Sequence, residues 1–179
     1  MTQDEIVRAL EGKRNWERRL LFALSDSTKF EQIVAALAEP FKSSPVDMVA
    51  CFEALGFPLG ACVAHALKVG LLLVRKIEPG HDVSSAFETQ PFCDYENKQK
   101  TFKVLKRAVP RGTRILIVDD LYERGEQLRA ATDLLTRLGA NVIGAGFIGC
   151  RRSPDVNLDA CYGFPIRDLN DMGILNDDS

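Results

Sequence analysis

Residues 115–148 constrain the fold most, because they place a strand, an amphipathic helix and a second strand in close succession. The run Ile115–Val118 is continuously apolar, which is typical of a strand buried on both faces of a parallel sheet. Leucine and alanine residues at helical spacing follow, and Gly139 stands where a helix ends. Val142–Ile148 is apolar again. This order predicts a βαβ unit with a right-handed crossover, and therefore a parallel sheet.

The rest of the chain continues the alternation of helical and strand patterns. Three more segments carry apolar residues at helical spacing: 3–11, 16–24 and 59–67. A fourth helix is predicted through Phe30–Ala38, with capping candidates at Ser25–Ser27 and a stop before Pro40. Short apolar runs at Val46–Cys51 and Leu71–Val74 predict buried strands. We therefore expect one α/β domain over 1–179, with a Rossmann-like parallel sheet and helices on both faces.

Two later segments are harder to assign. Residues 80–98 have little periodicity and are interpreted as a long loop, which we expect to act as a mobile lid. Phe102, Leu105 and Val109 form a helical stripe that ends at Pro110. Seven basic residues and no acidic residue lie between Lys98 and Arg114, and they form either a solvated helix face or a rim that attracts an anionic substrate.

Composition excludes several classes of protein. Of the 179 residues, 46% are hydrophobic and 27% are charged, which is a globular balance, and the net charge of −2 offers no basic footprint for nucleic acid. The apolar runs are too short to cross a membrane, and the charged N-terminus does not resemble a secretory signal. Five scattered cysteines and two histidines supply no frame for a protein-bound metal. We expect a cytoplasmic protein with free thiols.

The strongest chemical signal is the pair Asp119-Asp120, directly after the predicted strand Ile115–Val118. In α/β sheets, ligands bind beyond the carboxyl ends of the strands. Two adjacent carboxylates are costly to bury without partners, so they are expected to face a cation, hydroxyl groups or water. An acidic pair at a strand end is not specific by itself, since receiver domains also place acidic residues there.

Two stretches resemble a known family. RILIVDDLYERGEQLRAATDLLTRLGANVIGAGFI resembles the ribose-phosphate motif of type I phosphoribosyltransferases, adenine phosphoribosyltransferases in particular. That motif is a hydrophobic strand, two acidic residues, the loop Ala-Thr-Gly-Gly-Thr and a helix. CFEALGFPLGACVAHALKVGLLLVRK resembles the family's segment with an acid-Ser-Arg-Gly-Phe turn, a helix, a strand and an Arg-Lys pair. The resemblance covers roughly residues 24–150 and implies a phosphoribosyltransferase-like fold, with residues 1–24 as a helical N-terminal extension or hood.

The resemblance also implies roles for individual residues. Asp119 and Asp120 match the acidic residues that hold the ribose hydroxyls of phosphoribosyl pyrophosphate, whose Mg²⁺ bridges the pyrophosphate. Arg75 and Lys76 match the basic pair beside the pyrophosphate, and Glu96 aligns with the catalytic-loop acid on the purine side.

The two phosphate-contacting segments depart from the family pattern. Glu123–Gln127 replaces the small-residue loop, so that only Gly125 is kept and Arg124 stands in place of a threonine. Ala54–Leu55 replaces Ser-Arg in the upstream turn, which keeps its Gly56. Such a loop approaches a 5′-phosphate through backbone N–H groups and needs small residues for close contact. The resemblance is thus to a family member with a degenerate phosphate-binding loop, in which Gly56, Arg124 and Gly125 are expected to contact substrate.

Two functions are consistent with these residues. The first is an adenine phosphoribosyltransferase-like enzyme, which forms AMP by transferring phosphoribose from phosphoribosyl pyrophosphate to a purine base, with Arg18 near the adenine. The second is a catalytically impaired module that senses a nucleotide or a phosphoribosyl compound. In either case the resemblance implies a homodimer, while net charge and the short apolar runs argue against binding to nucleic acid or membrane. The retained Asp119-Asp120 favours the enzyme, and the changed loop favours the module.

Overall fold

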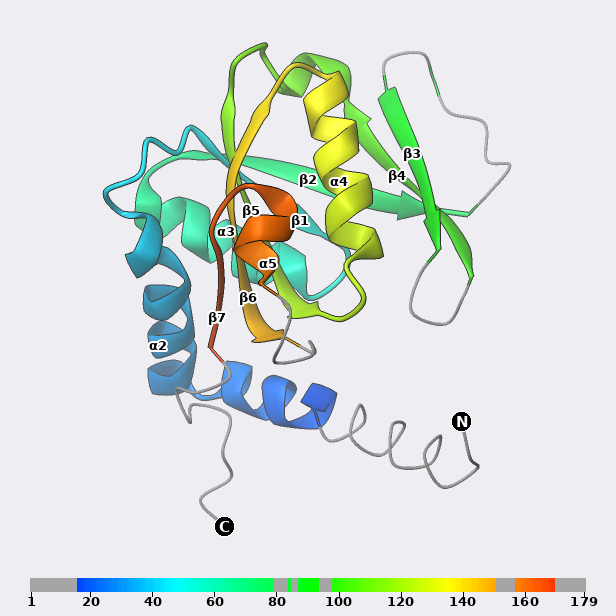
Figure 1. Ribbon diagram of the computed structural model, residues 1–179. Helices are drawn as coiled ribbons and strands as arrows, with labels where there is room; N and C mark the ends of the chain where they lie inside the picture. Colours follow the sequence, from blue (N-terminus) through cyan, green and yellow to red (C-terminus); the bar gives the residue numbers. More distant parts are fainter. Residues whose placement is uncertain (1–15, 79–83, 85–86, 94–97, 151–156, 170–179) are drawn as a thin grey trace.

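A seven-stranded sheet organises the chain (Figure 1). The computed structural model describes residues 16–78, 84, 87–93, 98–150 and 157–169. The strands lie in the order β3-β4-β2-β1-β5-β6-β7. Their bounds are β1 Met48–Phe52, β2 Gly70–Ile77, β3 Phe87–Cys93, β4 Gln99–Leu105, β5 Arg114–Tyr122, β6 Asn141–Cys150 and β7 Ile166–Asp168. From β2 to β7 all neighbouring strands are parallel, whereas β4 and β3 are antiparallel, so the predicted α/β fold is confirmed with a mixed, mostly parallel sheet.

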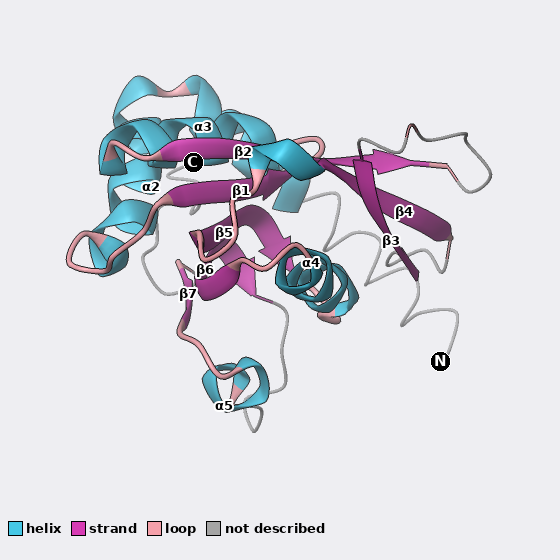
Figure 2. Ribbon diagram, turned by 90° about the horizontal axis from the view of Figure 1, so that it is seen from above, coloured by secondary structure: helices cyan, strands magenta, loops and turns pink. Residues whose placement is uncertain are grey.

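Helices cover both faces of the sheet, as expected (Figure 2). They are α2 Ser27–Ala38, α3 Gly56–Leu67, α4 Glu126–Arg137 and α5 Leu158–Tyr162, with 3₁₀ turns at Glu39–Phe41 and Lys106–Ala108. Residues 16–25 are also helical, whereas the helix predicted over 3–11 lies outside the described residues. The side chain of Asp26 caps α2 by accepting a hydrogen bond from the Lys29 amide at 2.9 Å, as the predicted capping segment requires. Among the described helices, none is both long and apolar enough to traverse a bilayer.

Strand β5 is buried on both faces over Ile115–Val118, which explains the unbroken apolar sequence of that run. Ile115 and Ile117 pack with α4, whereas Leu116 and Val118 pack with α2 and α3. All four side chains are fully buried. The βαβ prediction therefore holds, because each apolar position along β5 has a helix to pack against.

The segment from β3 to β4 differs from the sequence prediction. Residues 87–93 are strand β3 rather than loop, and they pair with β4, where a helix was predicted. Phe102 and Val104 are buried with the spacing of a strand, while Leu105 is 43% exposed. The expectation of one long loop over 80–98 and of a helical stripe over 102–109 was therefore wrong.

The basic residues of this segment consequently lie along a strand and its flanks rather than on a helix. Two of their lysines form ion pairs, Lys100 with Glu78 just after β2 and Lys106 with Glu88 of β3. Lys103 lies over the ring of Phe87 at 5.1 Å from its centroid. Ion pairs thus neutralise Lys100 and Lys106, and Lys103 contacts an aromatic ring.

Strand β2 is less buried than its apolar sequence predicted. Leu72 and Val74 are in the core, but Leu71 and Leu73 are 41% and 45% exposed. Helix α3 packs mainly over β1 and β5, and the opposite face of β2 contributes to the core around α4. One face of β2 is thus left open.

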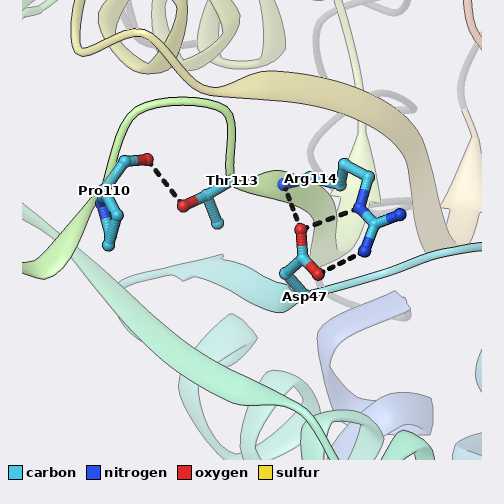
Figure 3. Close-up of polar contacts among 4 residues, drawn as sticks. All are labelled: Asp47, Pro110, Thr113 and Arg114. Atoms are coloured by element: carbon cyan, nitrogen blue, oxygen red, sulfur yellow. Dashed lines mark hydrogen bonds and ion pairs between the residues drawn. The ribbon is translucent and has the colours of Figure 1, made fainter.

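The amino-terminal ends of β1 and β5 are joined by an ion pair (Figure 3). Asp47 accepts hydrogen bonds from the backbone N–H and from the Nε of Arg114, both at 2.8 Å. The Arg114 guanidinium lowers the pKa of Asp47 to about 2. Beside them Thr113 donates a hydrogen bond to the Pro110 carbonyl at 2.6 Å. Local hydrogen bonds and an ion pair thus hold the amino-terminal ends of β1 and β5 together.

Candidate functional site

Asp119 and Asp120 lie near the carboxyl end of β5, where the sequence predicted a site. Asp119 is only 5% exposed, and its carboxylate packs against the backbone of Gly56 at the start of α3. A Cβ atom on Gly56 would lie 2.5 Å from Asp119 Oδ1, so only glycine fits there. Gly56 therefore acts by allowing α3 to approach the carboxylate closely.

The burial of Asp119 has an electrostatic consequence. Desolvation raises the pKa of its carboxyl well above the ordinary value, and the charge of Asp120 raises it further, while Lys76 acts in the opposite direction. A buried carboxyl group with a raised pKa differs from an ordinary surface aspartate, which is solvated and ionised. Such perturbed carboxyl groups in clefts are characteristic of binding and catalytic sites.

A cavity of about 180 Å³ adjoins the acidic pair. Its lining comes from four parts of the chain: Trp16 and Glu17, Leu55, Lys76, and Asp119, Asp120, Leu121, Glu123 and Gln127. Figure 1 places the helix of residues 16–25 at the end of the sheet where β6 finishes, and the Trp16 ring lies against Gly149 of that strand. The helix of residues 16–25 therefore contributes Trp16 and Glu17 to one wall of the cavity.

Two side-chain atoms at this cavity are buried without a hydrogen bond. They are Trp16 Nε1, a donor, and Gln127 Oε1, an acceptor, and neither has a partner within the described part of the chain. Buried polar atoms are usually satisfied. One unsatisfied donor and one unsatisfied acceptor thus belong to residues that line the cavity.

Glu53 bonds to both residues of the basic pair, to the side chain of Arg75 and to the backbone of Lys76. The Glu53 carboxylate accepts a hydrogen bond from Arg75 Nε at 2.7 Å and another from the Lys76 backbone N–H at 2.7 Å. The Arg75 side chain is 61% exposed and does not line the cavity, whereas Lys76 does. Glu53 thus holds β2 at the point where it leaves β1 and turns to pair with β4.

The loop after β5 is held by two tyrosines. Gly125, the N-cap of α4, has a φ of 84°, and its carbonyl accepts a hydrogen bond from the Tyr162 hydroxyl at 3.1 Å. Burial raises the pKa of Tyr122, and its hydrogen bond with Tyr162 raises it further. A Cβ atom on Gly125 would lie 2.5 Å from both tyrosine hydroxyl oxygens. The glycine is required both for its backbone angle and for this close contact.

A second, smaller cavity of about 20 Å³ lies against this loop. The whole segment from Leu121 to Leu128 lines it, together with Asp119, Phe52, Cys93 and Phe147. Arg124 and Gly125, both predicted to contact substrate, are therefore here rather than at the larger cavity. The two cavities meet at Asp119 and along the loop.

The structure thus brings some of the predicted site residues together and separates others. Asp119, Asp120 and Lys76 share the larger cavity, whereas Arg75 points elsewhere. Arg18 is exposed and is not among the lining residues, and Glu96 lies outside the described residues.

Sequence reasoning missed Trp16, Glu17, Gln127 and Tyr162 as site residues. Gln127 had a signal in the sequence, since it replaces the last threonine of the family loop. The other three come from helices far from the loop in sequence, and only the packing of the fold brings them there.

No three acidic, histidine or cysteine side chains of the described residues are grouped so that they could hold a metal ion. Asp119 and Asp120 offer carboxylate oxygens, which suit Mg²⁺, but two neighbouring carboxylates are too few for a dedicated protein site.

Residues 23–162 match the family model of the phosphoribosyl transferase domain, which is well over half of the chain. The chain belongs to the phosphoribosyltransferase family. An adenine phosphoribosyltransferase of Xanthomonas oryzae pv. oryzae is 36% identical over 125 residues, which cover 70% of this chain and 65% of that protein. One from Methylobacterium nodulans is 37% identical over 133 residues, covering 73% and 70%. The match to the Xanthomonas relative thus spans slightly less than two thirds of its length.

Solved phosphoribosyltransferase structures agree with this assignment. The adenine phosphoribosyltransferase of Thermoanaerobacter pseudethanolicus superposes with a TM-score of 0.71 at 29% identity, covering 82% of this chain and 83% of that one. The enzyme of Rhodothermus marinus gives 0.68 at 25% identity, covering 82% and 81%.

Proposed function

We propose that this chain is a purine phosphoribosyltransferase of the adenine type, which forms AMP and pyrophosphate from adenine and phosphoribosyl pyrophosphate. The observation that carries the proposal is the buried Asp119 beside Asp120, at the carboxyl end of β5 and next to a cavity of about 180 Å³. The relatives named adenine phosphoribosyltransferase support the choice of base.

In the proposed reaction, the bond from ribose C1 to pyrophosphate breaks and a bond from C1 to a purine nitrogen forms. Asp119 and Asp120 accept hydrogen bonds from the ribose hydroxyls and hold the sugar in place. Their negative charge also favours the positive charge that develops on the sugar as pyrophosphate leaves. Lys76 is the cation at the cavity and is placed to attract the departing pyrophosphate.

Mg²⁺ belongs to the substrate in this proposal. The family implies that it arrives on the pyrophosphate, where it neutralises charge. The two carboxylates of Asp119 and Asp120 are compatible with an ion that brings most of its own ligands. The residues of this chain bind the other parts of the substrate: Asp119 and Asp120 bind the ribose, and Lys76 attracts the pyrophosphate.

A second candidate function is a binding or regulatory module without turnover. Leu55 stands where the family has an arginine beside the pyrophosphate, and it lines the cavity. Loss of a guanidinium group removes two-pronged binding of phosphate oxygens. We propose in addition that the phosphate-binding loop is degenerate, since Glu123 and Glu126 replace small residues of the family loop.

One experiment separates the two candidates. Phosphoribosyl pyrophosphate with Mg²⁺, and separately AMP, are titrated into the full chain by calorimetry, and AMP formation from adenine is then assayed. Binding with turnover supports the transferase, and binding without turnover supports the module. Absence of binding for both ligands contradicts both candidates.

We propose a cytoplasmic protein with one domain over 1–179, whose first 24 residues form the hood. Family resemblance supports a homodimer, and the open face of β2, with Leu71 and Leu73 exposed, is a candidate part of its interface. Sedimentation equilibrium tests this: the native chain is expected at twice its mass of 19.9 kDa.

A further inference from the structure

The indole ring of Trp16 packs directly on the backbone of a glycine in β6. A Cβ atom at Gly149 would lie 2.3 Å from Cη2 of the Trp16 ring and 2.8 Å from both Cζ2 and Cζ3. Carbon atoms in van der Waals contact are about 3.5–4.0 Å apart. Any residue other than glycine would therefore overlap the six-membered part of the indole, so the missing side chain at this position makes room for the ring.

The same contact joins the helix of residues 16–25 to the strand end that carries the acidic pair. Gly149 is the register partner of Leu121, which follows Asp120 on β5. Trp16, Leu121 and Asp120 all line the larger cavity. The contact between the indole and Gly149 therefore determines where this wall of the cavity stands relative to the acidic end of β5.

Other side chains hold the helix of residues 16–25 in place. Leu20 and Ala23 of this helix are buried in the same hydrophobic cluster against which Trp16 packs. Trp16 lies one turn before Leu20 and thus on the same side of the helix. The atoms that meet position 149 are at the far end of the Trp16 side chain, so a side chain at 149 is expected to displace the indole rather than the helix. Displacing the indole changes the cavity wall that it forms.

We infer that Gly149 is a positioning residue of the larger cavity, which holds the Trp16 indole where the wall fits the ligand. The inference rests on the proposed function, in which this cavity binds the substrate. Strand β6, which the structure describes over its whole length, contributes no lining residue of its own to this cavity. Gly149 therefore acts on the ligand through the indole. A side chain at 149 should weaken binding, and that effect should disappear when the outer atoms of the indole are removed.

A double-mutant cycle between positions 149 and 16 tests the inference. AMP, the proposed product, is titrated by calorimetry into the native full chain, Gly149→Ala, Trp16→Phe and the double variant. Phenylalanine keeps an aromatic ring at position 16 and lacks the outer indole atoms.

The matched control is Gly146→Ala, on the same strand. A Cβ atom at Gly146 would lie 3.4 Å from its nearest neighbour, a methyl group of Leu37, which is an ordinary contact. Thermal unfolding verifies that each variant is folded. Tryptophan emission reports the surroundings of the indole in the chains that keep Trp16, because it is the one tryptophan of the chain.

Gly149→Ala is expected to shift the tryptophan emission and to bind AMP about tenfold more weakly, while Gly146→Ala behaves like the native chain. In the Trp16→Phe background, Gly149→Ala should cost no further affinity. A tenfold loss in both backgrounds would show that Gly149 acts without the indole and would overturn the inference. Native affinity in Gly149→Ala would also overturn it and would leave the proposed transferase in place.

The double variant decides the outcome if Gly149→Ala does not fold. A folded double variant that binds AMP like Trp16→Phe supports the inference, because the overlap is then with the indole. An unfolded double variant overturns it. Absence of AMP binding by the native chain would overturn both this inference and the adenine-type product proposed above.

Discussion

Asp119 lies at the proposed ribose site, and burying its carboxylate costs free energy of folding. Its carboxylate is almost completely buried, and its neighbours are another carboxylate and one lysine. Because burial raises its pKa in the folded chain, the folded state holds the proton more tightly than the unfolded state does. The contribution of Asp119 to the free energy of unfolding is therefore most favourable below the unfolded pKa. It is lost as the pH rises through the folded pKa.

Asp119→Asn should consequently stabilise the protein at neutral pH. The amide keeps the shape of the side chain and removes the buried charge. If the relief is about 1 kcal/mol, the Tm rises by roughly 2–4 °C in a chain of this size. The gain should shrink as the pH falls toward the unfolded pKa of Asp, near 3.8. Thermal unfolding at several pH values measures it, with Asp133→Asn as control, and a lower Tm at pH 7 would refute the electrostatic account.

At the scale of the element, the proposed degeneracy of the loop between β5 and α4 concerns the binding of phosphate. Glu123 and Glu126 flank Gly125 at the start of the helix. At about 6 Å and an effective dielectric constant of about 20, each carboxylate repels one unit of phosphate charge by roughly 3 kcal/mol before screening. The helix terminus returns only about 0.3–1 kcal/mol.

Restoring the family loop should therefore tighten the binding of phosphoribosyl pyrophosphate. The variant carries Glu123→Ala, Arg124→Thr, Glu126→Gly and Gln127→Thr, with Gly125 retained. Relief of half of one repulsion, about 1.4 kcal/mol, corresponds to tenfold tighter binding. Calorimetry of both chains with Mg²⁺ present measures the change. Low-micromolar binding by the native loop, with no gain in the restored one, would mean that both glutamates face away from the ligand.

The elements also indicate which parts of the fold can be predicted from the sequence. The unit from β5 to β6 was predictable because the apolar side chains of Ile115–Val118 are all buried. The β3–β4 hairpin was not, because its strands are half exposed. Phe102, Leu105 and Val109 suggested a helix, although the buried pair is Phe102 and Val104. Leu105, exposed at the end of β4, lies three residues after Phe102, and this spacing is the one expected for the apolar face of a helix.

At the scale of the whole molecule, the site is assembled from distant segments. Asp119 and Asp120 could be predicted as site residues because they follow a strand directly, and strand ends carry ligands in such folds. Trp16 and Tyr162 could not, since they are brought to the loop by helices that precede and follow the central unit. Arg75 matched the family pattern, yet its pairing with Glu53 depends on where β2 changes partner.

The fluorescence of Trp16 can report ligand binding in the larger cavity directly. Trp16 is the chain's one tryptophan, and it lines the larger cavity. A ligand that fills the cavity should therefore change the tryptophan emission in a saturable way, with a midpoint that agrees with calorimetry. The same titration of Trp16→Phe should show no such signal. Calorimetric binding without any change in emission would place the ligand away from Trp16.

The central claim is that the acidic pair at the end of β5 binds the ribose of the ligand. Calorimetric titration of the native chain and of the double variant Asp119→Asn, Asp120→Asn tests it, with adenosine, AMP and phosphoribosyl pyrophosphate with Mg²⁺ as ligands. The double variant is expected to stay folded and to lose affinity for every ligand that the native chain binds, because charge-assisted bonds to the ribose hydroxyls are removed. Equal affinities in the two proteins would contradict the claim.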